Sequence, residues 1–445
     1  MGIRAGKPSD ARHRAEPHRR ADRAAPAPGA AGGSGAAGSR LTACAIALLV
    51  VVLTPALAAA AERLRIATWH APLSREGPGL LLRDIRRDDP AIARVADILV
   101  ALRPDILLLT DLDWDLEGAA LAAFSERLQA AGLSLPNHFA ARPNSGWRTA
   151  FDLDGDGRAG RARDARGYGR FAGAGGMALF SRLPIDGAAV RDFTPLRWRE
   201  FPGNLLTEEE ARRGDGKGPW LSSTAHWDVP VILPGGARLH LLAFAATAPV
   251  FDGPEDFNGR RNHDEIAFWA AYLDGRLPWP APDGPVVVLG NANLDPLDGE
   301  GLHEAIATLL AHPRLQDPRP SSRGAVLAAR RQGGGNKGQR GEPALDTADL
   351  GDGEGSPGNL RLSYILPDRR LRVAGAGVFW PVKGPAEEPR EKPAEEPAEG
   401  PVKGGAERKG MRHHLVWVDV ELPAQAGGAA GAPASGRRVV APGAN

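Results

Sequence analysis

Four short apolar runs along the chain each adjoin polar residues. They cover residues 64–70, 104–111, 286–295 and 413–420. Such runs are typical of buried strands that deliver polar side chains to the edge of a sheet, where functional sites usually lie. Apolar residues at helical spacing predict helices over residues 92–102, 116–131 and 264–273. The alternation of strands with helices predicts an α/β fold.

In their order and spacing, these runs resemble the endonuclease/exonuclease/phosphatase superfamily, whose fold is DNase I-like. In the family, the motifs T-W-N, L-L-x-E, G-D-x-N and S-D-H stand at four strand ends. The corresponding positions in this chain extend over residues 64–420. Four further segments resemble a bacterial secreted branch of the superfamily, namely residues 176–185, 226–231, 249–256 and 259–265. The resemblance implies a four-layer αββα sandwich of two packed mixed sheets. It also implies metal-dependent phosphoester hydrolysis, usually with Mg²⁺.

Most positions that carry catalysis in this family hold different residues here. His70 stands where the family has Asn, and Asp111 stands where it has the Glu that anchors the metal. The Asp of G-D-x-N is Asn291, whereas the Asn of that motif is kept as Asn293. The resemblance therefore implies a catalytic set of His70, Asn291, Asn293 and His413, with Asp111 as the metal ligand, in which several positions are substituted.

Three further substitutions remove charged or titratable groups. Ala245 replaces a His, Ser363 replaces an Asp, and Arg412 replaces the Asp that precedes the retained His413. An amide cannot accept a proton near neutral pH, so Asn291 cannot act as the general base. The loss of one such group typically costs about 10²- to 10³-fold in rate. We therefore expect little or no hydrolysis, and a binding or scaffold role toward a phosphate ester or a small phosphorylated ligand.

Two other functions remain compatible with the same residues. An active Mg²⁺-dependent phosphodiesterase or phosphomonoesterase would use Asp111, Asn293 and His413. Alternatively, His70, Asp111 and His413 would suit a transition metal such as Zn²⁺ or Fe²⁺, because imidazole is a ligand that these metals favour.

A second candidate metal site lies in the sequence D-L-D-G-D-G. Asp152, Asp154 and Asp156 occupy positions 1, 3 and 5 of a calcium-loop pattern, with Gly at position 6. Position 12 is Arg163 where a bidentate Glu belongs, and Asp164 follows it. The motif predicts a Ca²⁺ loop, and a polar, Gly-rich turn is the alternative.

Several other polar residues are candidates for substrate binding. The motifs of the secreted branch place His226, Arg260 and Arg261 near the expected cleft, together with Asp228 and His263. Each has an alternative role in an ion pair at a turn or at the edge of a sheet.

The first 61 residues differ in composition from the rest. Residues 1–40 are rich in Arg, Ala, Pro and Gly, and an apolar run over residues 41–57 ends in four alanines. This pattern predicts a basic, disordered leader followed by a signal peptide, and hence a secreted or periplasmic protein with no membrane span after cleavage. Cys44, the only cysteine, lies in the predicted signal. The oligomeric state is not indicated by the sequence.

The remaining chain predicts one large domain with two insertions and a tail. The domain covers residues 62–422, with low-complexity insertions at 333–358 and 385–410 and a disordered tail at 423–445. Residues 1–40 hold eight of the 55 basic and three of the 54 acidic residues, which leaves an acidic excess in the domain. Tight nonspecific binding of nucleic acid needs a basic surface, so nucleic acid is not the expected partner.

Overall fold

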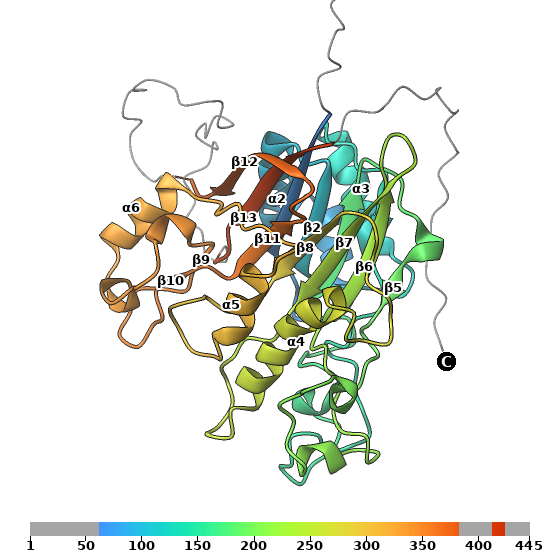
Figure 1. Ribbon diagram of the computed structural model, residues 1–445, viewed down its shortest axis with the longest axis vertical. Coiled ribbons are helices and arrows are strands. Elements are labelled where there is room, and N and C mark those ends of the chain that lie inside the picture. Colours follow the sequence, from blue (N-terminus) through green and yellow to red (C-terminus); the bar gives the residue numbers. More distant parts are fainter. Residues whose placement is uncertain (1–61, 382–411, 423–445) are drawn as a thin grey trace, which may run out of the picture. The chain divides into compact units, whose positions relative to one another are not determined.

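The computed structural model describes residues 62–381 and 412–422. The predicted leader and signal (1–61), the insertion at 385–410 and the tail at 423–445 lie outside the described residues. Two sheets and a short two-stranded ribbon make up the β structure of the described chain (Figure 1).

The first sheet has six strands and is mixed. Its order is β12 (Arg372–Phe379), β13 (Leu415–Glu421), β1 (Arg63–Leu73), β2 (Ile106–Leu112), β4 (Gly176–Ser181) and β3 (Asn137–Phe139). β1 runs parallel to β2 and antiparallel to β13. The sheet therefore brings the predicted first, second and fourth apolar runs side by side.

The second sheet has five strands and is also mixed. Its order is β11 (Ser363–Pro367), β8 (Val286–Asn291), β7 (Arg238–Ala245), β6 (Ala225–Ile232) and β5 (Arg191–Asp192). β8 runs parallel to β7 and antiparallel to β11. The ribbon pairs β9 (Ala348–Asp349) with β10 (Asn359–Leu360).

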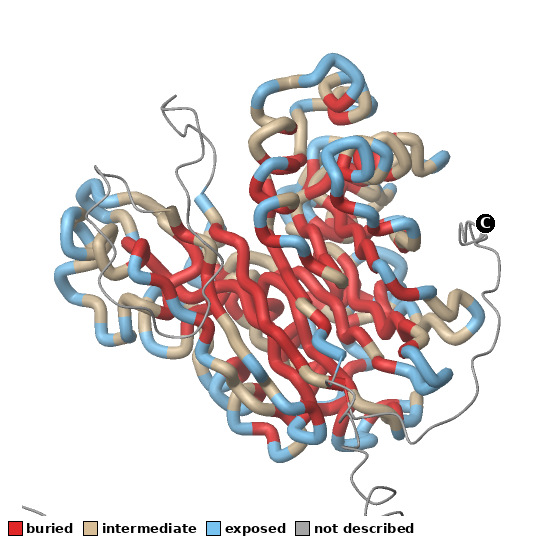
Figure 2. Tube along the Cα trace, turned by 90° about the horizontal axis from the view of Figure 1, so that it is seen from above, coloured by how far each residue is buried: buried red, intermediate tan, exposed pale blue. Residues whose placement is uncertain are grey.

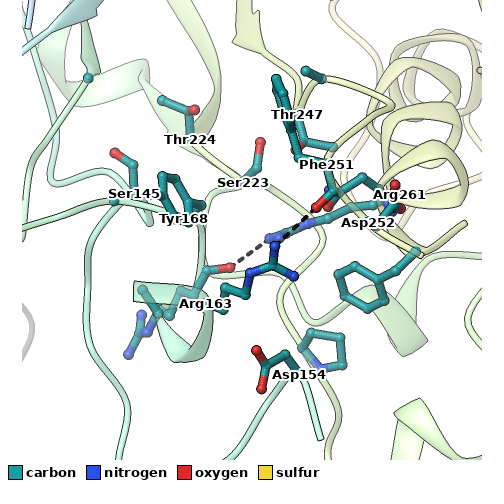
Figure 3. A pocket seen from close by; sticks show the side chains of 18 of the residues that line it. Ser145, Asp154, Arg163, Tyr168, Ser223, Thr224, Thr247, Phe251, Asp252 and Arg261 are labelled. Atoms are coloured by element: carbon teal, nitrogen blue, oxygen red, sulfur yellow. Dashed lines mark hydrogen bonds between the residues drawn. The ribbon is translucent and has the colours of Figure 1, made fainter. Parts of the chain in front are cut away.

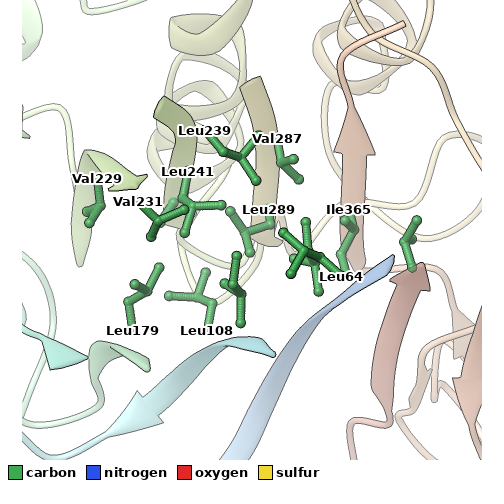
Figure 4. Close-up of a cluster of buried hydrophobic side chains, with 14 of the residues drawn as sticks. Leu64, Leu108, Leu179, Val229, Val231, Leu239, Leu241, Val287, Leu289 and Ile365 are labelled. Carbon is green, nitrogen blue, oxygen red and sulfur yellow. The ribbon is translucent and has the colours of Figure 1, made fainter. Parts of the chain in front are cut away.

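The two sheets pack face to face through alternate residues of strands that are apolar on both sides. On β2, Ile106 and Leu108 point into the layer between the sheets, whereas Leu107 and Leu109 point to the outer helices. The central layer includes Leu64, Leu179, Leu241 and Leu289, which interdigitate in Figure 4. A side-chain period of two places these residues on one face, so both faces of each central strand are buried. Figure 2 shows the resulting band of buried strands.

Helices cover the outer face of each sheet. The six-stranded sheet is covered by α1 (Leu80–Arg86), α2 (Pro90–Leu102) and α3 (Ala119–Ala130), and the five-stranded sheet by α4 (Phe257–Leu273) and α5 (Glu304–Leu310). The sixth helix, α6 (Arg323–Arg331), contributes Ala325 to the layer between the sheets. Asp89 caps α2 by accepting a hydrogen bond from the backbone nitrogen of Ala91 at 2.8 Å. The predicted four-layer αββα sandwich of two mixed sheets is confirmed.

α4 begins at Phe257, two turns before the predicted start at Asp264. Its first turns are polar in sequence, which hid the helical pattern, yet Arg261, Asn262 and Asp264 are buried there. They are buried because backbone and indole groups satisfy them: Asn262 donates to the carbonyls of Thr247 and Ala292, and Asp264 accepts from Trp198.

The Gly-rich segment 333–358 is described and follows the end of α6. It contains two 3₁₀ turns, Gly334–Lys337 and Pro343–Leu345, and then β9. Ala348 of β9 forms a β-bridge with His413. This segment therefore packs beside a predicted site residue. None of the helices in the described residues is both long and apolar enough to cross a membrane.

Replacing Leu108 with Ala should lower the free energy of unfolding by about 2–5 kcal/mol, because a cavity would remain between two closely packed sheets. Urea denaturation measures this, with Leu297→Ala as the control, since Leu297 is 48% exposed and should change stability by less than about 0.5 kcal/mol. Equal losses for the two variants would contradict the assignment of the core.

Candidate functional site

The predicted site residues converge at one end of the two packed sheets. β1 lies against β8 and β11 across the sandwich, so the end of β1 with His70 faces the end of β8 with Asn291. Asn291 pairs with Ser363 on one side and with Ala245 on the other. The positions that the resemblance brought together from distant parts of the sequence are therefore neighbours in the fold.

A chain of hydrogen bonds joins the two asparagines to His70. Asn293 donates from Nδ2 to the carbonyl of Ala246 at 2.8 Å, and its Oδ1 accepts from Asn291 Nδ2 at 3.1 Å. Asn291 Nδ2 also lies 3.2 Å from His70 Nδ1, while Asn291 Oδ1 accepts from the backbone nitrogen of Asn293 at 3.3 Å.

The backbone carbonyl of Ala246 fixes the donor-to-acceptor direction of this series of hydrogen bonds. A carbonyl only accepts, so Ala246 requires the Nδ2 end of Asn293, which turns Asn293 Oδ1 toward residue 291. Asn291 Nδ2 is the donor to this oxygen, and an amide supplies such a donor whereas an ionised carboxylate does not. Asn291 is 1% exposed. The surroundings of this position thus match the amide in the sequence.

His70 and His413 lie against each other at the cleft wall. Their ring centroids are 4.3 Å apart, and Trp69 Nε1 donates to the carbonyl of His413 at 3.0 Å. His413 Nδ1 is buried and has no hydrogen-bond partner among the described residues, and the same is true of Ser363 Oγ. Arg412, which the resemblance aligns with an Asp of the family, is exposed. The retained imidazole therefore lacks the acceptor that would orient it.

Burial shifts the pKa values of His70, Asp111 and His413 in the direction that favours the uncharged form of each side chain. It lowers the pKa of His70 to about 4. Burial, together with the nearby His70, His414 and Arg412, lowers the pKa of His413 well below its ordinary value. Burial raises the pKa of Asp111 to about 7, and the negative charge of Asp113 adds to this rise while Arg75 opposes it.

These residues do not fit a Mg²⁺ site. Mg²⁺ is held through carboxylates and needs near-ideal oxygen geometry. Asp111 is the one carboxylate among the family positions. The Oδ1 atoms of Asn291 and Asn293 already accept hydrogen bonds within the site.

The transition-metal alternative is not supported by the geometry either. His70 Nε2 and Asp111 Oδ2 are 4.0 Å apart. In the described chain, however, a set of three potential ligand atoms within 4.8 Å of one another occurs at Asp152, Asp154 and Asp156 and not at His70, Asp111 and His413.

A cleft of about 1300 Å³ opens from this site. His70, Asp111 and Asn293 line one part of it, and the loops around residues 153–175 and 246–258 line the rest. In Figure 3, Ser145, Tyr168 and Thr224 face Phe251 and Asp252 across the cleft, and Asp154 lies below them. Sequence motifs gave no signal for most of these lining residues, because they lie in loops outside the strand ends.

The structure corrects the expectation that His226 and Arg260 bind substrate. His226 is 1% exposed and hydrogen-bonds to Ser222 Oγ and to the carbonyl of Glu265. Arg260 is paired with Glu210 at 2.7 Å and does not line the cleft. Both are structural residues.

Arg261 does line the cleft, but its guanidinium is engaged elsewhere. It is 6% exposed and donates to the carbonyls of Leu221, Trp220, Ser222 and Arg166. It thus holds the loops in place. Asp228 is buried against His240 and Tyr272, and His263 pairs with Asp264, so neither of these residues belongs to the cleft.

The candidate calcium loop brings its three carboxylates together. Asp152 accepts from the backbone nitrogens of Gly155 and Gly157, each at 2.7 Å, so the loop folds around this side chain. Asp164 is not available as a ligand at the end of the loop, because it is buried and accepts from the backbone of Leu153 and Arg161. Arg163 points to the carbonyl of Phe251. A bound Ca²⁺ would therefore rely on the three aspartates, backbone oxygens and water.

Comparison with known proteins agrees with the fold. A model of the Endonuclease/Exonuclease/phosphatase family matches residues 74–389, and the chain therefore belongs to this family. Members of this family are generally metal-dependent phosphoesterases. No curated protein matches the chain.

Solved structures with the same fold are distant in sequence. An endonuclease/exonuclease/phosphatase from Beutenbergia cavernae is 16% identical, with a TM-score of 0.47, over 81% of this chain and 72% of that one. Sphingomyelinase C from Streptomyces griseocarneus is 15% identical, with a TM-score of 0.42, over 80% of this chain and 99% of that one. A family protein from Bacteroides thetaiotaomicron is 14% identical, with a TM-score of 0.41, over 81% and 98%.

The raised pKa of Asp111 predicts a pH-dependent cost to folding. A carboxyl whose folded pKa lies above its unfolded value of 3.8 favours the folded state while protonated, so stability falls as the pH rises from about 4 to about 7. Asp111→Asn should therefore gain stability relative to the wild type across this window, as measured by urea unfolding at pH 4, 5.5 and 7.5. Burial lowers the pKa of His70, which makes the stability of both proteins rise with pH over the same range. Comparing the variant with the wild type removes this contribution of His70. Asp97→Asn, on the exposed side of α2, is the control, and parallel curves for Asp111→Asn and the wild type would refute the shift.

If the Asp152 loop binds calcium, millimolar Ca²⁺ should raise the melting temperature, because a ligand of the folded state stabilises it. The double change Asp152→Ala and Asp154→Ala should abolish this rise. Asp352→Ala, in another exposed Gly-rich turn, should leave it intact. No rise in the wild-type protein would show that the segment is a polar turn.

Proposed function

We propose that this protein is an exported member of the family that has lost phosphoester hydrolysis and binds a phosphate-bearing ligand in the cleft. The observation that carries the proposal is the hydrogen-bond chain from the Ala246 carbonyl through Asn293 to Asn291. It places an amide donor where the family has the carboxylate that takes the proton of the attacking water.

The other substitutions act in the same direction. Ala245, next to Asn291 in the sheet, offers no imidazole to stabilise charge on a phosphoryl oxygen. Among the described residues His413 Nδ1 has no acceptor, and burial together with the nearby His70, His414 and Arg412 lowers the pKa of His413 well below its ordinary value, which favours the uncharged imidazole. With no base, no oriented acid and no fitting metal site, an activated water is not formed.

Two features of the sequence and one of the structure support export and a small ligand. The apolar run at 41–57, which ends in alanines, is typical of a signal peptide. The acidic excess after residue 40 disfavours a polyanion such as a duplex. The size of the cleft, about 1300 Å³, suits a small molecule.

Purified protein should hydrolyse bis(4-nitrophenyl) phosphate and 4-nitrophenyl phosphate in Mg²⁺ or Mn²⁺ no faster than in EDTA. The reason is the absent proton acceptor at residue 291. Release of 4-nitrophenol, followed by absorbance, measures this. Robust metal-dependent turnover that is lost on changing Asn293 or His413 to Ala would favour the active-enzyme alternative instead.

Restoring the family's residues tests the proposal more sharply than measuring the absence of activity. The changes that rebuild the family pattern are Asn291→Asp, Ser363→Asp, Arg412→Asp, Ala245→His, His70→Asn and Asp111→Glu. Catalytic groups that act as a unit are not additive, so single changes should do almost nothing and the combined variant should gain metal-dependent activity. The matched control carries the same changes but keeps Asn291, and it should remain inactive.

A further inference from the structure

Arg166 differs from the other arginines of the cleft because its guanidinium has no hydrogen-bond or ion-pair partner in the described part of the chain. The remaining cleft arginines are engaged by carboxylates or carbonyls: Arg75 by Asp84, Arg170 by Glu76, Arg213 by Glu209, Arg163 by the Phe251 carbonyl, and Arg261 by several carbonyls. Arg166 therefore has its donors free at the cleft wall.

Two indole rings hold the Arg166 guanidinium between them. Its Cζ lies 3.5 Å from the ring centroid of Trp147 and 4.3 Å from that of Trp220. Arg142 stacks on the far side of Trp147 at 3.6 Å, and Arg197 stacks on Trp220 at 3.5 Å. The result is a ladder in which three arginines alternate with two tryptophans.

Stacking on both faces leaves the edge of the guanidinium as its binding surface. The five N–H donors of an arginine lie in the plane of the group, in a fork that matches two oxygens of one anion. The backbone of Arg166 is also fixed, because its nitrogen donates to the Trp147 carbonyl and its own carbonyl accepts from Arg261. The donors are therefore held in place before any ligand arrives.

The charges nearest to Arg166 favour an anion. Burial, together with the positive charges of Arg197 and Arg142, lowers the pKa of Arg166 to about 10, and no carboxylate is among the causes of this shift. The group stays cationic at neutral pH, and its positive charge is not neutralised by the protein. An anionic ligand would supply the missing counter-charge.

Ser145 provides an independent sign of a ligand in the same place. It lines the cleft, is 4% exposed, and its Oγ has no hydrogen-bond partner among the described residues. A β-bridge joins Ser145 to Gly167, which is the residue after Arg166. A buried hydroxyl without a partner is uncommon, and a ligand oxygen would satisfy it.

The rim of the cleft exposes aromatic surface. Tyr168 is 67% exposed and Phe251 is 82% exposed, and both line the cleft. They are the two exposed aromatics among the large apolar side chains of the described residues. Phe251 has a φ of 70°, which is rare for a bulky residue, and Arg163 holds its carbonyl from the other side of the cleft.

We propose that Arg166 and Ser145 bind the tetrahedral oxyanion of a phosphate or sulfate ester. Tyr168 and Phe251 contact an aromatic group carried by the same ligand. This names the class of ligand for the cleft, and so it rests on the proposed binding function. It does not depend on the loss of hydrolysis, because neither Arg166 nor Ser145 is one of the family's catalytic positions.

Isothermal titration calorimetry of the full chain in EDTA tests this with inorganic phosphate, phenyl phosphate and phenyl sulfate. The wild type should bind phenyl phosphate or phenyl sulfate more tightly than inorganic phosphate, and the tighter of the two esters identifies the oxyanion. Arg166→Gln should weaken ester binding at least about tenfold, because a charge-assisted bidentate contact is lost. Arg142→Gln is the matched control, since Arg142 belongs to the ladder but does not line the cleft, and it should weaken binding less than about threefold.

Two further variants cover the case in which Arg166→Gln disturbs folding. Ser145→Ala removes only the unpartnered hydroxyl and should weaken all three ligands. Tyr168→Ala should weaken the aromatic esters but not inorganic phosphate. The proposal is overturned if the wild type binds none of the three ligands at millimolar concentration, or if Arg166→Gln and Arg142→Gln have equal effects. Hydrolysis of the esters without EDTA would count against the proposed loss of activity while leaving this binding result intact.

Discussion

The packing of β1 against β8 and β11 across the sandwich is the constraint on which the site depends. These strands belong to different sheets and are far apart in the sequence, and the central layer, with Leu64 and Leu289, locks their faces together. Because both faces of the central strands are buried, a shift of one residue would move every apolar side chain to the wrong layer. The register is therefore fixed, and the polar ends of the strands meet in one place whether or not they still perform chemistry.

This separation of scaffold from chemistry explains how the site could change without loss of the fold. Asn291 ends its strand in the register that places it between Ser363 and Ala245, yet its side chain now donates to Asn293. Asn291 is a neutral amide that is satisfied by its neighbours, so no ionised group is kept out of water at this position. At Asp111, by contrast, the site keeps an ionisable group, and burial raises the pKa of this carboxyl to about 7.

The alternation of apolar strand runs with helices predicted an α/β fold, whereas the four-layer sandwich was implied by the resemblance to the family. The convergence of His70, Asn291 and His413 was also predictable, but only through the family's motifs, since nothing local in the sequence places them together. The start of α4 was missed because Arg261 and Asn262 have the character of surface residues until their tertiary partners are known.

Features of the site that depend on tertiary neighbours were beyond sequence reasoning for a related physical reason. His226 was expected in the cleft, yet it is buried against Ser222 and Glu265, because alternation along β6 turns it to the layer of α4. Arg166 carries no motif, and its role depends on Trp147 and Trp220, which lie on either side of it only in the folded chain. Stacking and the absence of a partner are properties of three-dimensional neighbours, and hydrophobic periodicity does not encode them.

The central claim is that the family's metal site no longer holds a metal. The most direct measurement is Mn²⁺ binding, followed by electron paramagnetic resonance, in the protein that carries Asp152→Ala and Asp154→Ala, so that the calcium-like loop does not contribute. The account predicts that an equimolar amount of protein leaves the spectrum of free Mn²⁺ unchanged. Protein and Mn²⁺ are each used at about 0.1 to 1 mM, the range of dissociation constants that is typical of weak cation sites. Stoichiometric Mn²⁺ binding that disappears on changing Asp111 to Ala would contradict it.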